Sequence, residues 1–158
     1  MAWTSPRTWT AGEVPTAATF NTHVRDNFKA IGDAWTSYTP TLANWTLGNG
    51  TLTGNYIAAG KLIIGKISYT VGSTDTKSGQ IQFSLPVTKV TDGGFGFPLG
   101  TAELYDTSAP ARNIVHAVQN STTALRLCAG DGTFVSDTSP WTWATGDEIN
   151  VVFQYEAA

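Results

Sequence analysis

The sequence is poor in cysteine and histidine, the residues that most often build disulfides and metal sites. Its single cysteine, Cys128, cannot form a disulfide within the chain, so packing or association with other chains must stabilise the fold. Its two histidines, His23 and His116, are far apart in the sequence, which argues against a zinc site built by one chain. A metal could be bound only if the same histidine of three chains met around a three-fold axis of an assembly. We therefore expect no metal and no cofactor.

Charge and long apolar runs are also scarce. Charged residues make up 13% of the 158 residues, and the formal net charge is -3 at pH 7. Lysines and arginines are scattered singly, so no basic stripe is present to neutralise phosphates, and we expect no nucleic-acid partner. No apolar run approaches the roughly 20 residues of a membrane span, and the N-terminal residues lack a signal-peptide pattern. The sequence predicts a protein made in a cytoplasm and not inserted into a membrane.

Enzyme motifs are missing as well. No serine stands in a G-x-S-x-G motif, and no glycine-rich phosphate loop opens a helix. Asp147 and Glu148 are adjacent, so on a strand they face opposite sides and cannot form the carboxylate pair of a glycosidase. The segment GDGTFVSD, which contains Asp131 and Asp137, lacks the spacing of a calcium loop and is typical of a hairpin turn. We expect no catalytic residues and no enzymatic activity.

The first residues of the chain form a segment without periodicity. Residues 1–15 contain two prolines and two tryptophans, Trp3 and Trp9. Prolines without a hydrophobic period predict an extended arm rather than a helix or strand. Two large apolar rings on such an arm indicate that it anchors the chain by binding a neighbouring surface.

A helix is expected next, in the segment 16–37. Thr16 is suited to cap its N-terminus and Gly32 to end it. One apolar row on this helix contains Phe20, Val24, Phe28, Ile31 and Trp35. An overlapping row with the alternating spacing of a heptad seam contains Ala17, Phe20, Val24, Asn27, Ile31 and Ala34.

So short a helix needs partners, because isolated helices of about 12–15 residues are marginal in water. We expect the seam to meet sister helices in a homotrimer, while Phe28 and Trp35 meet the rest of the same chain. Asn27 would then fix the register of the seam at some cost in stability. The alternative is a monomer in which the helix packs across its own β-sheet.

Short alternating segments separated by Gly, Asn and Asp predict an antiparallel β head over residues 38–158. The segments GQIQFSLP (79–86) and DEINVVFQYE (147–156) alternate strictly and are each expected to bury one face. The first half of GKLIIGKISYTVG (60–72) is apolar on both faces, which predicts apolar neighbours on both sides. Further strands are expected at 51–58, 95–105, 112–119, 123–129 and 132–136. Seven or eight short strands at this spacing indicate a sandwich or jelly roll.

Aromatic residues are the remaining candidates for ligand binding. Trp141 and Trp143 lie two residues apart, so in an extended segment both rings project to one face. Such a pair either stacks on a sugar or is buried against the sheet, and the sequence leaves both interpretations open.

The front of the chain carries a pattern that resembles a known family. The segment PRTWTAGEVPTAATFNTHVRDNFKAIGD is similar to the N-terminal segment of many virion proteins of phages that infect actinobacteria, in which W-x-x-G-E-x-x-T-A-x-x-x-N-x-H-V-R-D-N recurs. The matching positions are Trp9, Gly12, Glu13, Thr16, Ala17, Asn21, His23, Val24, Arg25, Asp26 and Asn27. The following residues are similar to a β module of the same proteins, carried by Tyr38, Pro40, Gly48, Asn49, Gly50, Gly54, Tyr56, Gly60, FSLP and the closing GDEINVVFQYEA.

The resemblance implies a non-enzymatic virion component, homotrimeric, with a β-sandwich head. The leading expectation is a short tail fibre or minor tail protein whose helix joins protomers or docks on other virion proteins and whose head contacts a host surface glycan. The alternative is a capsid decoration or head-fibre protein anchored through the arm and helix. A carbohydrate-active enzyme or lysin fragment would need a carboxylate pair or metal cluster. A monomeric sugar-binding module would be monomeric in solution and bind glycans without a particle.

Overall fold

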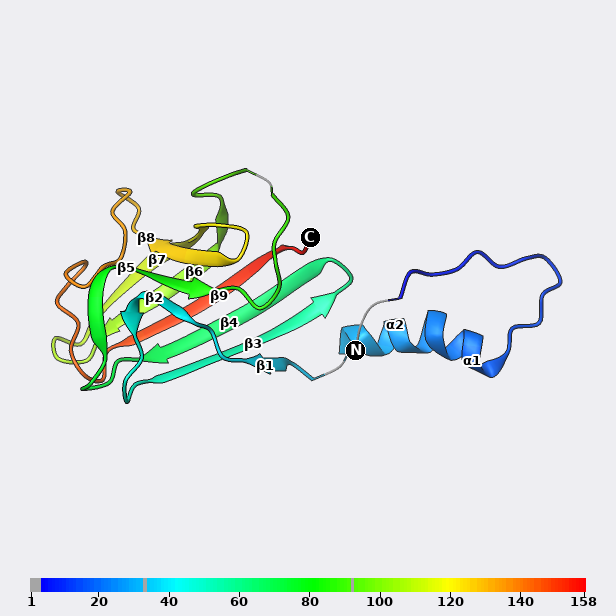
Figure 1. Ribbon diagram of the computed structural model, residues 1–158, viewed down its shortest axis with the longest axis horizontal. Coiled ribbons are helices and arrows are strands. Elements are labelled where there is room, and N and C mark those ends of the chain that lie inside the picture. Colours follow the sequence, from blue (N-terminus) through cyan, green and yellow to red (C-terminus); the bar gives the residue numbers. More distant parts are fainter. Residues whose placement is uncertain (1–3, 33, 92) are drawn as a thin grey trace.

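A computed structural model of the chain describes residues 4–32, 34–91 and 93–158. Figure 1 shows two parts, which we name the stem (residues 4–32, the arm and the helix) and the head (residues 36–158, the strands). The stem extends beyond the end of the sheet at which β1 (Thr36–Tyr38) lies. No helix in the described ranges is long and apolar enough to cross a bilayer.

The helix follows Thr16, its expected N-cap, and ends at Gly32, the glycine expected to end it. Its consecutive parts are α1 (Ala17–Phe20), a π-helical turn η1 (Asn21–Arg25) and α2 (Asp26–Gly32). The Thr16 hydroxyl caps it by accepting a hydrogen bond from the Thr19 amide at 3.2 Å. The assignment of residues 16–37 to the helix is wrong at its end, because Thr36–Tyr38 is a strand of the head.

The head is one antiparallel sheet. After β1 its strands are β2 (Leu42–Thr46), β3 (Thr51–Ala59), β4 (Leu62–Thr70), β5 (Thr76–Ser84), β6 (Pro98–Asp106), β7 (Ala111–Gln119), β8 (Ala124–Cys128) and β9 (Glu148–Glu156). They are hydrogen-bonded in the order β1-β3-β4-β9-β6-β7-β8-β5-β2. The predicted fold class, mainly β with antiparallel strands and an N-terminal helix, is confirmed. The sandwich or jelly-roll arrangement stays a prediction, since the strands form a single curled sheet.

The two edge strands of this sheet, β1 and β2, follow each other in the sequence. The chain between them, residues 39–41, therefore links opposite edges and holds the sheet in its curl (Figure 1). Inside the curl, the Trp45 ring on β2 lies 6.2 Å from the Tyr69 ring on β4, and Tyr69 lies 6.4 Å from Phe83 on β5. These edge-to-face contacts join strands from distant parts of the sheet into one core.

Alternation along the strands predicts which side chains are buried. Both strictly alternating segments bury the expected face, for example Phe83 and Val151. The expectation of apolar neighbours on both faces of the segment 60–72 is wrong within the chain, because Leu62 and Ile64 are exposed on the outer face. The expected strand at 132–136 is also absent, and only isolated bridges such as Cys128 to Phe134 form there.

Close packing between β6 and β9 gives a first prediction. An added Cβ at Gly100 would overlap the carbonyl oxygen of Val152, which belongs to the backbone of β9 and cannot rotate away. We expect Gly100→Ala to lower the free energy of unfolding by about 1–3 kcal/mol, measured by urea denaturation. Gly130→Ala is the matched control, because no atom lies within 4 Å of its added Cβ. Equal stability of the two variants would show that β6 can move away from β9.

Candidate docking surface

The arm is not loose but runs back along the helix, and Asn27 fastens it there. The Asn27 side chain accepts a hydrogen bond from the Thr4 amide at 2.9 Å and donates to the Thr4 carbonyl at 2.7 Å. It also donates to the His23 carbonyl, one turn earlier, at 3.2 Å. Asn27 is buried in this arrangement. The side-chain amide of Asn27 therefore pairs with both the N–H and the carbonyl of Thr4, as the backbone of a neighbouring β-strand would.

His23 makes the neighbouring contact. Its Nδ1 atom lies 3.2 Å from the carbonyl oxygen of Ser5, at hydrogen-bonding distance. His23 and Asn27 are four residues apart, so they lie on one side of the helix. That side faces the arm.

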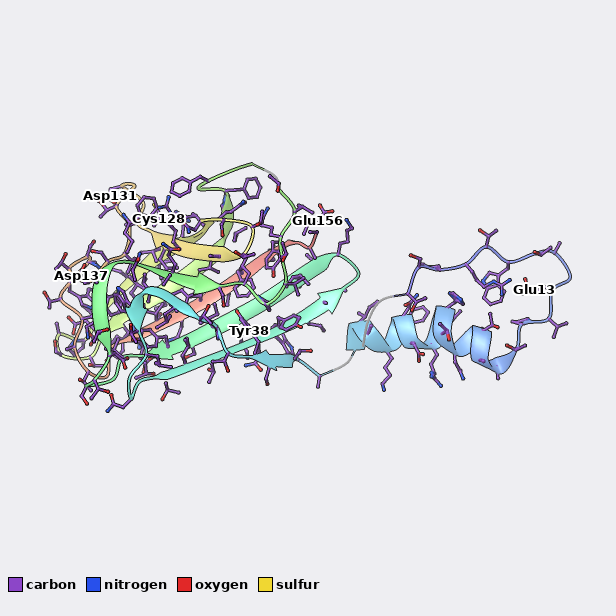
Figure 2. All side chains as sticks on the ribbon, viewed as in Figure 1. Glu13, Tyr38, Cys128, Asp131, Asp137 and Glu156 are labelled. Atoms are coloured by element: carbon purple, nitrogen blue, oxygen red, sulfur yellow. The ribbon has the colours of Figure 1, made fainter. Side chains whose placement is uncertain are left out.

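The far part of the arm is organised around Glu13. Its carboxylate pairs with Arg7 at 2.8 Å and accepts from the Thr10 amide at 3.2 Å. The Arg7 guanidinium lies 4.9 Å from the centre of the Trp9 ring. Gly12 supplies the left-handed turn, with φ of 81°. Figure 2 shows Glu13 on the stem, far from Tyr38 and Glu156 of the head.

Next to the side that faces the arm, the helix carries partly exposed apolar side chains. Its row has spacings of four, four and three and consists of Phe20, Val24, Phe28 and Ile31, which we name the apolar ridge. Phe20, Phe28 and Ile31 are 50%, 73% and 53% exposed, respectively. These three side chains are therefore at least half in contact with solvent. The apolar ridge is the candidate docking surface.

The structure changes the predicted roles of several stem residues. Asn27 is bound to the arm of its own chain, so its predicted place in a seam between helices is wrong. Phe28 does not meet the head, because its side chain is largely in solvent. Trp35 lies beyond the helix rather than on it, but it meets the head as expected, because the Lys66 ammonium of β4 is 5.4 Å from its ring centre. Ala17 is exposed at the helix start, and Trp3 lies outside the described residues.

The Asn27 contact can be tested alone. Asn27→Ala removes the acceptor of the Thr4 amide, so we expect this amide to exchange its hydrogen about fivefold faster, as fits the loss of a hydrogen bond worth ~1 kcal/mol. Residue-resolved hydrogen exchange measures this. Thr22→Ala, at an exposed helix position, is the control. Unchanged exchange at Thr4 would mean that other contacts hold the arm.

The two tryptophans proposed for ligand contact are part of the head interior. Trp143 is buried, donates from Nε1 to the Ser136 carbonyl at 2.9 Å and packs 5.6 Å from Trp45. Trp141 is half-buried, with its ring 5.2 Å from that of Trp143. A ligand-stacking role for Trp143 is therefore wrong, because its ring belongs to the core.

In the part of the chain that the structure describes, the histidine, cysteine and carboxylate side chains form no metal-binding cluster. Within the described ranges, no three His, Cys, Asp or Glu side chains are placed to hold a metal ion. Cys128 is a half-buried free thiol. Most buried carboxylates bind backbone amides: Asp147 accepts from Thr107 at 3.0 Å and from Ala144 at 2.8 Å. These carboxylates shape turns.

Sequence reasoning missed two features of the molecule. One is the arm bound along the helix, for which the polar residues Asn27 and His23 at a spacing of four were the available signal. The other is Arg126, which is buried on β8 between two phenylalanine rings contributed by loops. Comparison with known proteins adds no family to this description: no family model, no curated protein and no solved structure matches the chain.

Proposed function

We propose that the protein is a non-enzymatic virion structural protein, a homotrimeric short tail fibre or minor tail protein. Its stem joins the protomers and docks on other virion proteins, and its head points outwards toward the host surface. The observation that carries this proposal is the apolar ridge, whose Phe20, Phe28 and Ile31 side chains are half or more exposed on a helix that already binds the arm. The resemblance of the front segment to phage virion proteins supports the same function.

The apolar ridge supports self-association for a physical reason. The helix is little longer than the about 12–15 residues below which isolated helices are marginal, and the arm is hydrogen-bonded to it through His23 and Asn27. Packing the exposed rings of three copies against one another would remove this apolar surface from water. The three-fold state follows from the family resemblance.

One observation favours the capsid alternative. Only residues 33–35 separate the helix from β1, so no shaft lies between stem and head. A decoration or head-fibre protein seated directly on a capsid needs no shaft, whereas a tail fibre that reaches outward commonly has one. In this alternative the stem is a capsid anchor.

Electron microscopy of intact virions, labelled with gold-conjugated antibody raised against residues 40–158, distinguishes the two positions. Gold at the tail end supports the fibre proposal, and gold scattered over the capsid replaces it with the decoration alternative. Virions that carry no gold, although the antibody binds the purified chain, would contradict both. The mass of the purified chain in solution tests the trimer independently.

A further inference from the structure

Arg126 is the one arginine buried within the described part of the head. Its side chain, only 6% exposed, stands on the outer face of β8, two residues before Cys128, which Figure 2 labels. The centre of its guanidinium lies 3.4 Å from the ring centre of Phe95 and 3.5 Å from that of Phe134. The cation therefore contacts two aromatic rings, whose planes are inclined at 60° to each other.

One edge of this guanidinium has no hydrogen-bond partner. Nη1 donates to Oε1 of Gln80 at 3.3 Å. Nε and Nη2 are buried without a partner. These two nitrogens form one edge of the planar group, which is the fork that binds a carboxylate or phosphate through two parallel hydrogen bonds. No acidic side chain in the described ranges forms an ion pair with Arg126.

A buried cation in this state is unusual. Burial lowers the pKa of the Arg126 guanidinium, but arginine remains charged at neutral pH. The two ring contacts stabilise the charge, yet they satisfy no N–H group at the edge of the guanidinium. Buried polar groups left unpaired in a native protein are rare, and a bound ion or water is one of the explanations for them.

One of the two rings over Arg126 is itself exposed to solvent. Phe95 is 65% exposed and gains little burial where it lies. Its chain neighbours Gly94 and Gly96 both have positive φ, of 68° and 85°. A ligand reaches the buried guanidinium edge only if this exposed ring shifts.

We propose that the Nε and Nη2 edge of Arg126 binds an oxyanion, a carboxylate or a phosphate group, carried by a polymer of the host surface. Phe95 and Phe134 are the aromatic faces on which the attached sugar or chain packs. The host origin of the oxyanion rests on the proposed function, whereas the binding site itself rests only on the geometry of Arg126.

The test follows the Nε–H signal of Arg126 in the NMR spectrum of the full chain. Sodium glucuronate and glycerol 3-phosphate are the probes, and glucose and sodium chloride at matched ionic strength are the controls. We expect a saturable shift of this signal with one or both anions, and none with glucose or chloride. The stronger probe distinguishes a carboxylate source from a phosphate source. The Nε–H signal of Arg112, an exposed arginine paired with Glu103, should show no saturable shift with either anion.

Arg126→Lys keeps the positive charge but loses the fork, so it should bind the preferred anion at least about tenfold more weakly. Titration of the unaltered chain decides the question even if this variant fails to fold, because the signals of Arg7, Arg25 and Arg112 can be assigned from their own lysine variants. No saturable shift with either anion would overturn the proposal and leave Arg126 as a clamp between two loops.

Asp92 supplies a second way to overturn it. This residue lies outside the described residues but only three positions before Phe95 in the sequence. If Asp92→Asn moves the Arg126 Nε–H signal in the absence of any anion, a carboxylate of the chain itself occupies the edge. Virion labelling and anion binding are separate measurements, so either can fail while the other succeeds.

Discussion

A chain carrying Phe28→Asp is expected to run as a monomer at concentrations where the unaltered chain is a trimer. Phe28 is 73% exposed in the single chain, so the new carboxylate costs the monomer little. In the trimer the same carboxylates would be buried against one another without partners, at several kcal/mol each. A tenfold change in affinity corresponds to 1.4 kcal/mol, so the dissociation constant should rise about 100-fold or more. Light scattering coupled to size-exclusion chromatography measures the mass.

Controls make this result specific to the apolar ridge. Thr22→Asp adds the same charge at an exposed position on another side of the helix and should leave the trimer intact. Val24→Asp, within the ridge, should dissociate it. Near-ultraviolet circular dichroism of the head tryptophans confirms that each variant is folded. A Phe28→Asp chain that stays trimeric and folded would remove the ridge from the interface, and a monomeric unaltered chain would contradict the trimer itself.

Replacing Asp75 should have the largest effect on the head. Its carboxylate accepts hydrogen bonds from the Tyr69 hydroxyl at 2.6 Å and from the amides of Gly48, Gly50 and Gly72 at 2.7, 3.0 and 2.7 Å. One side chain thus joins the β2–β3 turn to the end of β4. Asp75→Ala leaves these donors unpaired, including the fully buried Tyr69, and should cost about 3 kcal/mol or more in unfolding free energy.

The same carboxylate predicts a pH dependence. Burial alone would raise the pKa of Asp75, but the hydrogen bonds from Gly72, Tyr69, Gly48 and Gly50 outweigh it and hold the pKa below its ordinary value. The folded state then binds the proton less readily than the unfolded chain, so the stabilisation is complete above the unfolded pKa of about 3.9. It is lost as pH falls through the folded pKa.

Urea denaturation of the unaltered chain and of Asp75→Asn, at pH 7 and at steps down to about pH 3, checks this sign. The difference in stability between the two should shrink as the pH falls below about 4. Other carboxyl groups with a lowered pKa, Asp106 and Asp131, are common to both proteins and cancel in the difference. A difference independent of pH would mean that the ionised form of Asp75 is not what stabilises the turn.

Local patterns were enough to predict most of the head. Strict alternation identified β5 and β9, because each strand buries one face and exposes the other. β2 was missed because its alternation is broken: Asn44 has a positive φ of 66°, and the register with β5 shifts between Ala43 and Trp45. β1 was missed because Thr36–Tyr38 is too short to show a period.

The stem shows where periodicity misleads. The heptad spacing places Asn27 in a seam, since spacing alone does not reveal what a polar side chain binds. Its partner, Thr4, is 23 residues away, and their hydrogen bonds involve backbone groups that any residue carries. Arg126 poses the same problem. Alternation places it on the outer face of β8, but only the tertiary fold brings Phe95 and Phe134 over it.

The place of β9 in the sheet determines when the head can form during synthesis. β9 comes last in the sequence but lies between β4 and β6, with which it pairs along most of its length. Until residue 156 has left the ribosome, these two strands have an unpaired edge and the core lacks Ile149, Val151, Phe153 and Tyr155. The stem needs only residues 4–32 and is available much earlier. Nascent chains can therefore meet through their stems while their heads are still open, at a stage when the unpaired edges of β4 and β6 are prone to aggregation.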